Sequence, residues 1–330
     1  MQSPPSIDPR MPLLLRLEIA AAQLLESEMF EGRTERDIFD MLMRYGNINP
    51  GHPIVSAKSR AKMDLEDLED PVIAVYKKRE DRLLKGGGKV DMAFGVTMFF
   101  SVQCLRQQPF IEAEQFRQAP RVVEAWLRYL IEHDVCVEYN DDIYRALAVT
   151  ERAKIELVNC KQLAMTLPGK FNDACSMLFG GSLKDLGDSY AAGTADTSWV
   201  SASNGDTQGF GIITLSEAQA VYARATGGMA PEEAEYLGAE PHDVHVEEQL
   251  AGDHEEFCAF KCRRWDREAG KPISDEDGGR PFTLYFEREV AQHMCPGIYL
   301  EADLHQLSNG VHYIDQVTGV WPSYTPFDEM

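Results

Sequence analysis

Residues 126–181 contain the longest helical pattern in the sequence, and this stretch constrains the fold more than any other. Asn140 is a typical N-terminal residue of a helix, and apolar residues recur at helical spacing after it, as far as Met165. Pro168 ends the pattern, and a short apolar helix is expected over residues 171–179. The stretch therefore predicts a structural centre built from a long helix with a break at each end.

The chain before this stretch also has helical periodicity. Thr34 is expected to cap a helix that Gly46 ends, with Asp37 in place of the usual capping-box glutamate. Pro120 is expected to open another helix. Further helices are expected over residues 12–29, from Asp70-Pro71 onward and over residues 91–106.

Helical periodicity gives way to alternation after residues 182–208, which are rich in Gly, Ser, Thr and Asp. The segments GFGIITL (209–215), FCAFKC, PFTLYFERE and GIYLEADLHQL are strand candidates, and residues 216–226 could form a short helix. Asn309-Gly310 predicts a type I′ hairpin with VHYIDQVTGVW as its second arm. The expected fold is α+β, with a disordered stretch at 1–10, a helical domain at 11–187 and a strand-rich acidic domain at 188–330.

Composition places the chain among globular proteins, with 44% hydrophobic and 26% charged residues. No apolar stretch approaches the ~20 residues of a membrane span, and the N-terminus does not resemble a secretory signal. The seven cysteines include no CxxC pair, which favours reduced thiols and a nuclear and cytoplasmic location.

The net charge of -22 is concentrated in the second half of the chain. Residues 188–330 contain 26 acids against 8 bases, whereas residues 1–187 contain 28 against 24. Such a field repels a phosphate backbone and favours a basic protein partner. Residues 231–256 hold ten acids and no Lys or Arg, and they predict an exposed loop or a surface for that partner. The candidate partner-binding residues are Glu232, Glu233, Glu235, Glu247, Glu248, Glu255 and Glu256.

A second charged group lies in the first half, where five bases follow one another at the end of the helix that starts at Asp70. They complement the helix dipole, and a solvated helix face is the simpler interpretation. A contact with RNA phosphate or an acidic partner is the alternative. These residues are Lys77, Lys78, Arg79, Arg82 and Lys85.

Three groups of residues could be argued to carry chemistry. Cys175 and His133 could act as a thiol nucleophile and its base, although Cys175 lies on an apolar helix, where a buried structural thiol is expected. His242, His245, His254, Cys258 and Cys262 could bind zinc, but their spacing matches no standard module. The pair Asp141-Asp142 is explained by helix capping. GGGKVD at 86–91 is not a P-loop, because Val90 stands where Ser or Thr is needed. No catalytic site, cofactor or metal is expected.

Four segments carry a family resemblance: RDIFDMLMRYG near the start, HDVCVEY at 133–139, LPGKFNDACSMLFGG at 167–181 and LHQLSNGVHYIDQVTGVWPS near the end. With these segments in this order, the sequence resembles the fungal Argonaute-binding protein family, the first Argonaute-binding subunit of the Argonaute siRNA chaperone complex. The likeness covers most of residues 34–324.

The resemblance implies a non-enzymatic role. Such a subunit would join a second Argonaute-binding subunit and hold Argonaute with duplex siRNA, restraining slicing and passenger-strand release upstream of heterochromatin formation. A Lys-rich N-terminal tail is expected in the family, whereas this chain begins MQSPPSIDPR, which puts a tail-dependent contact in doubt. The alternatives from the residues are a Cys-dependent hydrolase that uses Cys175 and a direct duplex-RNA-binding protein.

Overall fold

The computed structural model describes residues 7–27, 29–30, 32–51, 70–83, 89–106, 112–191, 214–252 and 255–327. The chain forms two compact units, residues 1–158 and residues 159–330, which we call the helical unit and the sheet unit. The helices of the first unit and the antiparallel sheet of the second confirm the expected α+β class. In the described part of the chain, no helix combines the length and the apolar character that crossing a membrane requires.

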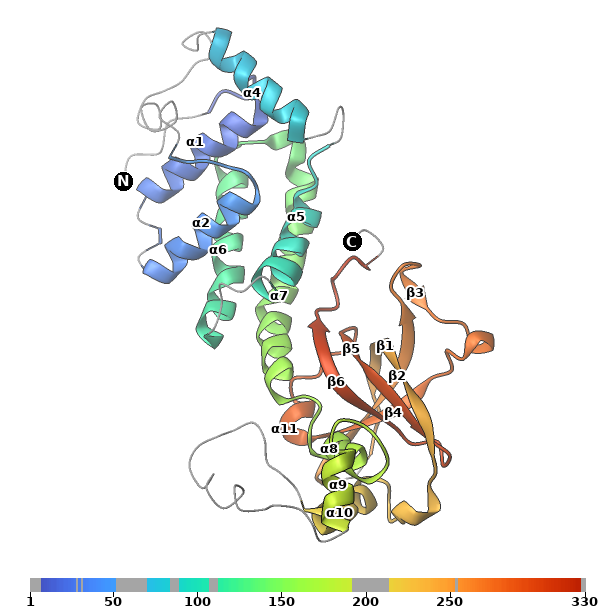
Figure 1. The fold of residues 1–330 in the computed structure, drawn as a ribbon. Helices are drawn as coiled ribbons and strands as arrows, with labels where there is room; N and C mark the ends of the chain where they lie inside the picture. The colour runs from blue at the N-terminus through green and yellow to red at the C-terminus, as the bar shows by residue number, and fades with distance from the viewer. Residues whose placement is uncertain are drawn as a thin grey trace. The chain divides into compact units, whose positions relative to one another are not determined.

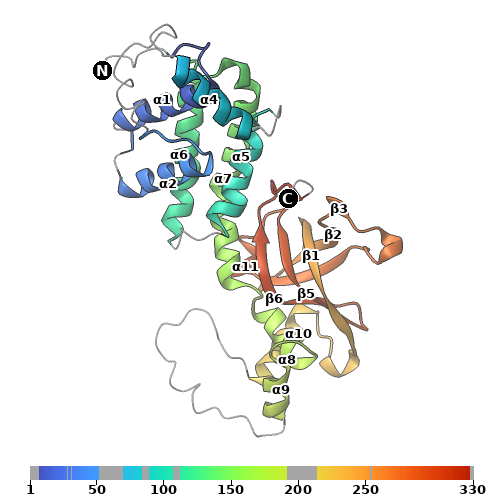
Figure 2. The ribbon, with the colours of Figure 1, turned by 45° about the horizontal axis from the view of Figure 1, so that its top comes forward.

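The helical unit is built around α6, against which α1 and α2 pack, while α4 packs on α1 (Figures 1 and 2). Phe39 of α2 meets Trp126 of α6 edge to face, with ring centroids 5.7 Å apart. The elements of this unit are α1 (Leu13–Glu26), α2 (Arg33–Tyr45), α4 (Asp70–Leu83), α5 (Met92–Met98), the π-helical η2 (Phe99–Cys104), α6 (Ala113–Glu132), the 3-10 turn η3 (Val137–Tyr139) and the first part of α7 (Asn140–Thr166).

The sheet unit contains a six-stranded antiparallel sheet in the order β3-β2-β1-β5-β6, and β4 pairs with the same edge of β2 as β3, on the side opposite β1. The sheet is strongly curved, and β4 also contacts β6 (Figure 1). After α7, the elements are α8 (Lys170–Leu178), α9 (Lys184–Ala191), α10 (Leu215–Ala225), η5 (Pro231–Glu233), β1 (Tyr236–Gln249), β2 (Phe257–Asp266), β3 (Lys271–Pro272), η6 (Asp275–Asp277), β4 (Phe282–Glu287), α11 (Arg288–Ala291), β5 (Tyr299–Leu307) and β6 (His312–Trp321).

Alternation in the strands separates two apolar layers. Alternate residues of β1, β2, β4 and β5, such as Val244, Phe260 and Leu300, are fully buried on one face. On the other face, Phe257 and Tyr313 pack with Phe171 of α8 and with α10 in a second core cluster. The helices α8, α9 and α10 gather at one end of the sheet (Figure 2).

Several helix ends differ from expectation. The N-cap of α2 is Gly32, whose N–H donates to Glu35 Oε2 at 3.2 Å, so Thr34 lies inside the helix. Pro120 does not open a helix, because α6 begins seven residues earlier at Ala113 and Pro120 lies inside it. Burial of Phe116 and Ala119 upstream of Pro120 extends the apolar stripe and offsets the hydrogen bond that proline cannot donate.

Three further expectations differ from the structure: the disorder at residues 1–10, the helix at residues 91–106 and the domain boundary at 187/188. Ile7 is buried, so the disorder expected for residues 1–10 does not apply to residues 7–10, and residues 1–6 lie outside the described residues. The helix expected over residues 91–106 forms as α5 followed by η2. The domain boundary expected at 187/188 falls within the sheet unit, because α8 packs against β4 and β6.

The expected loop at 231–256 is wrong over most of its length, because β1 occupies residues 236–249. The fully buried Val244 and Val246 alternate with Asp243, His245 and Glu247 on the opposite face, a period of two that indicates a strand. The helix expected at 216–226 is confirmed as α10, whose start at Leu215 removes that residue from the expected strand at 209–215. Residues 209–213 of that strand lie outside the described residues.

The hairpin between β5 and β6 is confirmed, but its turn is not type I′. Gly310 has a positive φ of 85°, whereas Asn309 is not among the positive-φ residues. Leu307 N–H donates to the Val311 carbonyl at 2.9 Å, which closes a three-residue loop with Gly310 in the left-handed position. Asn309 instead donates from Nδ2 to the Tyr222 hydroxyl at 2.7 Å, a contact with α10 that the local sequence cannot reveal.

Candidate partner-binding surfaces

The candidate acids divide into two groups. Glu232 and Glu233 belong to η5, and Glu235 immediately precedes β1; all three are exposed, and none forms an ion pair among the described residues. Glu247 and Glu248 lie near the end of β1, where they face bases of β2. The acidic stretch is therefore not one continuous surface for a partner.

Cross-strand ion pairs occupy the acids at the end of β1. Glu247 contacts Lys261 Nζ at 2.9 Å and Arg263 Nε at 2.7 Å, and Glu248 contacts Lys261 at 3.3 Å. Such pairs between neighbouring strands stabilise the pairing of a sheet. Much of the negative charge here is neutralised within the sheet.

The acids at the start of β2 also differ from each other. Glu256 contacts Arg224 of α10 at 3.0 Å, which ties the strand to the helix cluster. Glu255 is exposed, and its backbone carbonyl accepts a hydrogen bond from Arg288. Only the Glu255 side chain therefore resembles the first group.

The basic candidates on α4 are divided in the same way. Arg79 contacts Glu18 at 3.0 Å, and Glu18 is fully buried in α1. The Tyr76 hydroxyl donates to the same carboxylate at 2.5 Å, so Arg79 neutralises a buried charge. The other described bases, Lys77, Lys78 and Arg82, are exposed, and Lys85 lies outside the described residues.

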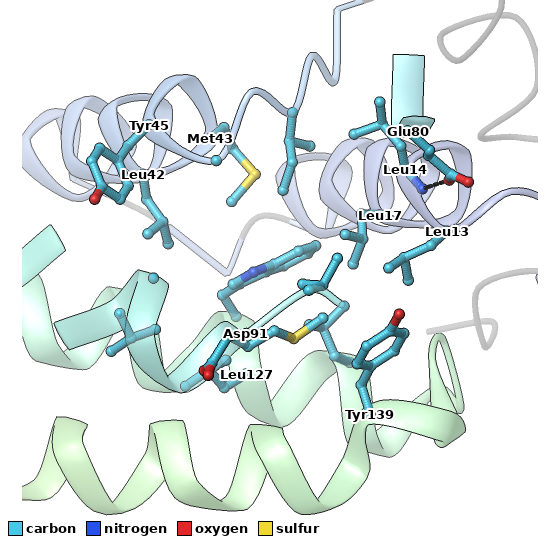
Figure 3. Close-up of a pocket in the computed structure, with 18 residues that line it drawn as sticks. Leu13, Leu14, Leu17, Leu42, Met43, Tyr45, Glu80, Asp91, Leu127 and Tyr139 are labelled. Atoms are coloured by element: carbon cyan, nitrogen blue, oxygen red, sulfur yellow. Dashed lines mark hydrogen bonds between the residues drawn. The ribbon is translucent and has the colours of Figure 1, made fainter. Parts of the chain in front are cut away.

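An apolar pocket of about 310 Å³ lies within the helical unit, near the low end of the ~300–1,000 Å³ that ligand pockets commonly occupy. Leu17 of α1, Leu42 of α2 and Leu127 of α6 contribute to its lining (Figure 3). Two carboxylates reach it, and both cap helices: Glu80 accepts from Leu14 N–H at 2.6 Å, and Asp91 accepts from Phe94 N–H at 2.8 Å. Burial raises the pKa of Glu80. The pocket suits an apolar side chain, and both of its carboxylates are engaged with backbone N–H groups at helix starts.

Cys175 is fully buried in the core cluster between α8 and the sheet, and burial raises the pKa of its thiol well above the ordinary value. A reactive cysteine needs accessible thiolate, so this environment is that of a structural thiol. His133, its suggested base, ends α6 in the other unit.

The suggested zinc ligands point in different directions. His242 and His245 are three residues apart on β1 and therefore lie on opposite faces. The His245 ring packs 5.0 Å from Trp265 and 4.8 Å from Tyr299, while Cys262 is buried on the other face. Cys258 is half-buried, and His254 lies outside the described residues. Within the ranges that the structure describes, no three His, Cys, Asp or Glu side chains are placed to share a metal ion.

Asp141 and Asp142 lie in the first turn of α7, where acids complement the helix dipole, but Asp142 has a second role. Its carboxylate accepts hydrogen bonds from the N–H groups of Met92 and Ala93, the first residues of α5. It also contacts Arg145 at 2.7 Å. Asp142 therefore connects two helices, which explains it without acid-base chemistry.

A buried carboxylate that sequence reasoning missed joins α8, and the turn between α8 and α9, to β6. Asp315 accepts hydrogen bonds from the hydroxyls of Ser176 and Ser182, each at 2.9 Å, and from Ser182 N–H. Burial alone would raise the pKa of Asp315, but these hydrogen bonds hold it below the ordinary value.

Two nearby carboxyls have the opposite shift. Burial raises the pKa of Asp173 to about 6, helped by the charges of Asp315 and Glu287. Burial also raises the pKa of Glu287, which accepts a hydrogen bond from Phe171 N–H at 2.6 Å. This cluster connects α8 to the sheet and gives the sheet unit a titratable interior.

Comparison with known proteins decides the family. A family model described as Argonaute siRNA chaperone (ARC) complex subunit Arb1 matches residues 6–247 and 234–328. The chain belongs to the Arb1 family. It is 22% identical over 330 residues to Argonaute-binding protein 1 of Schizosaccharomyces pombe, an alignment that covers 95% of this chain and 81% of the relative. No solved structure matches the chain. The resemblance expected from the four segments is confirmed.

Two of the segments that indicated the Arb1 family are packed together in the sheet unit. LPGKFNDACSMLFGG forms α8 and its flanks, and LHQLSNGVHYIDQVTGVWPS forms the β5-β6 hairpin. Asn172 Oδ1 accepts from Ile314 N–H at 2.9 Å, and the Tyr313 hydroxyl donates to the Gly180 carbonyl at 2.6 Å. These segments build the frame of the sheet unit.

Proposed function

We propose that this chain is a non-enzymatic, Argonaute-binding subunit of an siRNA chaperone complex. It holds Argonaute with duplex siRNA and restrains slicing and passenger-strand release during RNAi-directed heterochromatin formation. The observation that carries the proposal is the match to the Arb1 family across residues 6–328. The name of the fission yeast relative supports Argonaute as the partner.

The charge of the chain supports a protein partner over naked RNA. A net charge of -22 repels phosphates at long range and steers the chain toward basic proteins. Duplex siRNA is therefore engaged through Argonaute. A second Argonaute-binding subunit completes the complex, which works in the nucleus and the cytoplasm.

Affinity purification of the chain from its native cell tests the partners. Argonaute, a second subunit and small RNA are expected to co-purify. Absence of Argonaute would remove the proposal. A titration of the isolated chain with duplex RNA at physiological salt serves as the control, because strong binding there would favour direct RNA recognition through α4.

A cleavage assay tests the restraint of slicing. Argonaute loaded with duplex siRNA is incubated with and without the chain, and passenger-strand cleavage is followed over time. Slower cleavage is expected with the chain. An unrelated protein of similar size and net charge should leave the rate unchanged, and an unaltered rate with this chain would contradict the restraint.

A further inference from the structure

The first half of β1 has one edge without a strand partner in the described part of the molecule. β1 pairs with β5 from Tyr236 to His245, but its pairing with β2 begins only at Asp243. Residues 236–242 therefore present an uncovered edge on the β2 side.

Few backbone N–H and C=O groups along this edge are free to pair with an added strand. Val246 N–H donates to the Ile298 carbonyl at 3.0 Å on the β5 side, and backbone direction alternates along a strand. The groups of Ala239 and Pro241 therefore point to the uncovered edge, where Pro241 has no N–H. A full added ladder is excluded, so side chains must supply most of any binding energy at this edge.

Large apolar side chains are exposed at and just before this edge. Met229 is 41% exposed, Tyr236 42% and Leu237 58%. Tyr236 is held in place, because its ring packs on Gly180 and its hydroxyl lies 3.1 Å from His305 Nδ1. An anchored aromatic ring that stays partly exposed is the kind of side chain that is enriched at the centre of protein interfaces.

The charge around these apolar side chains is negative. Glu232, Glu233 and Glu235 are exposed and lack ion pairs among the described residues, unlike Glu247 and Glu248. The flanks of an incoming segment must therefore be basic, since complementary charge increases the association rate and excludes acidic competitors.

We propose that Met229, Tyr236 and Leu237, with the three glutamates before β1, bind an extended segment of Argonaute that carries an apolar side chain flanked by Lys or Arg. We call this the β1-edge surface. The inference rests on the proposed function, because that function supplies the identity of the partner. The apolar side chain packs against Leu237 and the Tyr236 ring, and the basic residues face the glutamates.

Binding of the full-length chain to purified Argonaute at 0.15 M salt tests the β1-edge surface. One variant is Leu237→Ser, and the other combines Glu232→Gln, Glu233→Gln and Glu235→Gln. Each is expected to raise the Kd by about 10-fold or more. A matched control combines Glu268→Gln, Glu276→Gln and Glu289→Gln, which removes the same charge from exposed positions elsewhere. It should change the Kd by less than about 3-fold, because only long-range attraction is lost.

A photo-crosslinking residue at position 237 identifies the occupant. The expected product joins the chain to an Argonaute peptide with an apolar residue between basic ones. Crosslinks to a second copy of this chain, or equal weakening by the control variant, would overturn the inference. If the wild-type chain did not bind Argonaute at all, the proposed function would be contradicted. If the wild-type chain bound and both variants had the same Kd, only the β1-edge surface would be contradicted. Circular dichroism confirms that each variant is folded.

Discussion

At the scale of single residues, packing decides which charges remain available to a partner. Glu233 and Glu247 are both acids of one negatively charged stretch, and the linear sequence does not distinguish them. The fold exposes Glu233 and places Glu247 opposite Lys261 and Arg263. The sequence predicted an acidic segment correctly, but the separation of free from paired acids depends on strand register, which long-range pairing sets.

Asp173 makes the stability of the sheet unit depend on pH. Its folded pKa of about 6 lies above the ordinary 3.8, so the folded state binds the proton more tightly than the unfolded state. The free energy of unfolding therefore falls as pH rises from about 4 to about 6, and it stays lower above that range.

Asp173→Asn should remove this pH-dependent loss of stability. The variant is expected to be more stable than wild type at pH 7.5 by about 1–3 kcal/mol, and nearly equal to it below pH 4. Hydrogen exchange of peptides that cover α8 and β6, compared between the two proteins at each pH, measures the difference. Equal protection at pH 7.5 would contradict the raised pKa.

Gly181 is required by both its conformation and its neighbours. Its φ is +133°, and a Cβ there would lie 2.3 Å from Asp315 Oδ2 and 2.5 Å from Ser176 Oγ. Gly181→Ala is expected to lower the free energy of unfolding by roughly 2–4 kcal/mol, as judged by urea unfolding. Gly228→Ala is the matched control, because Gly228 also has a positive φ but open space around it. A cost of only about 1 kcal/mol is expected there. Similar losses in both would show that the contacts with Asp315 do not matter.

At the scale of elements, periodicity located most helices and strands, and their ends depended on tertiary contacts. The stripe of α6 begins upstream of Pro120, because Phe116 and Ala119 are buried. β1 was missed because acids and a proline hide its alternation, and only the buried Val244 and Val246 reveal it. Strong local signals, such as the break at 168–169, were sufficient by themselves.

Substitution by alanine is expected to change stability in opposite directions at two glycines within helices. A Cβ on Gly95 of α5 would meet open space, whereas one on Gly187 would lie 2.3 Å from the Met177 carbonyl oxygen. Gly95→Ala should stabilise the chain by about 0.5–1 kcal/mol through reduced unfolded-state entropy. Gly187→Ala should destabilise it by about 1–3 kcal/mol, because α9 must move away from α8. Differential scanning calorimetry distinguishes the two, and a lower melting temperature for Gly95→Ala would contradict the argument.

At the scale of the whole molecule, the sheet unit includes helices that composition assigned to the other half. Phe171, Cys175 and Met177 of α8 belong to the cluster that also contains Phe257 and Tyr313. The low-complexity stretch after residue 181 suggested a boundary, but apolar contacts across that stretch join its two sides. Local composition indicates where a segment contributes few apolar side chains to a core. It does not indicate which distant strand a helix packs against.

Two fragments test this division of the chain. Residues 159–330 should fold cooperatively, whereas residues 188–330 should not, because they lack the α8 side chains that fill the cluster beneath the sheet. Thermal unfolding followed by circular dichroism is the measurement. A sharp transition in the shorter fragment would restore the boundary at 187/188.

The sequence by itself determined the α+β class, the long central helix with its two breaks, the hairpin near the C-terminus and the family, because each rests on local patterns or on short segments in order. Only the tertiary structure decided which acids remain exposed, which edge of β1 is uncovered and why the pKa of Asp173 is raised whereas that of Asp315 is lowered. These properties arise from contacts between residues far apart in the chain, where burial and hydrogen bonding set the energy of each charge.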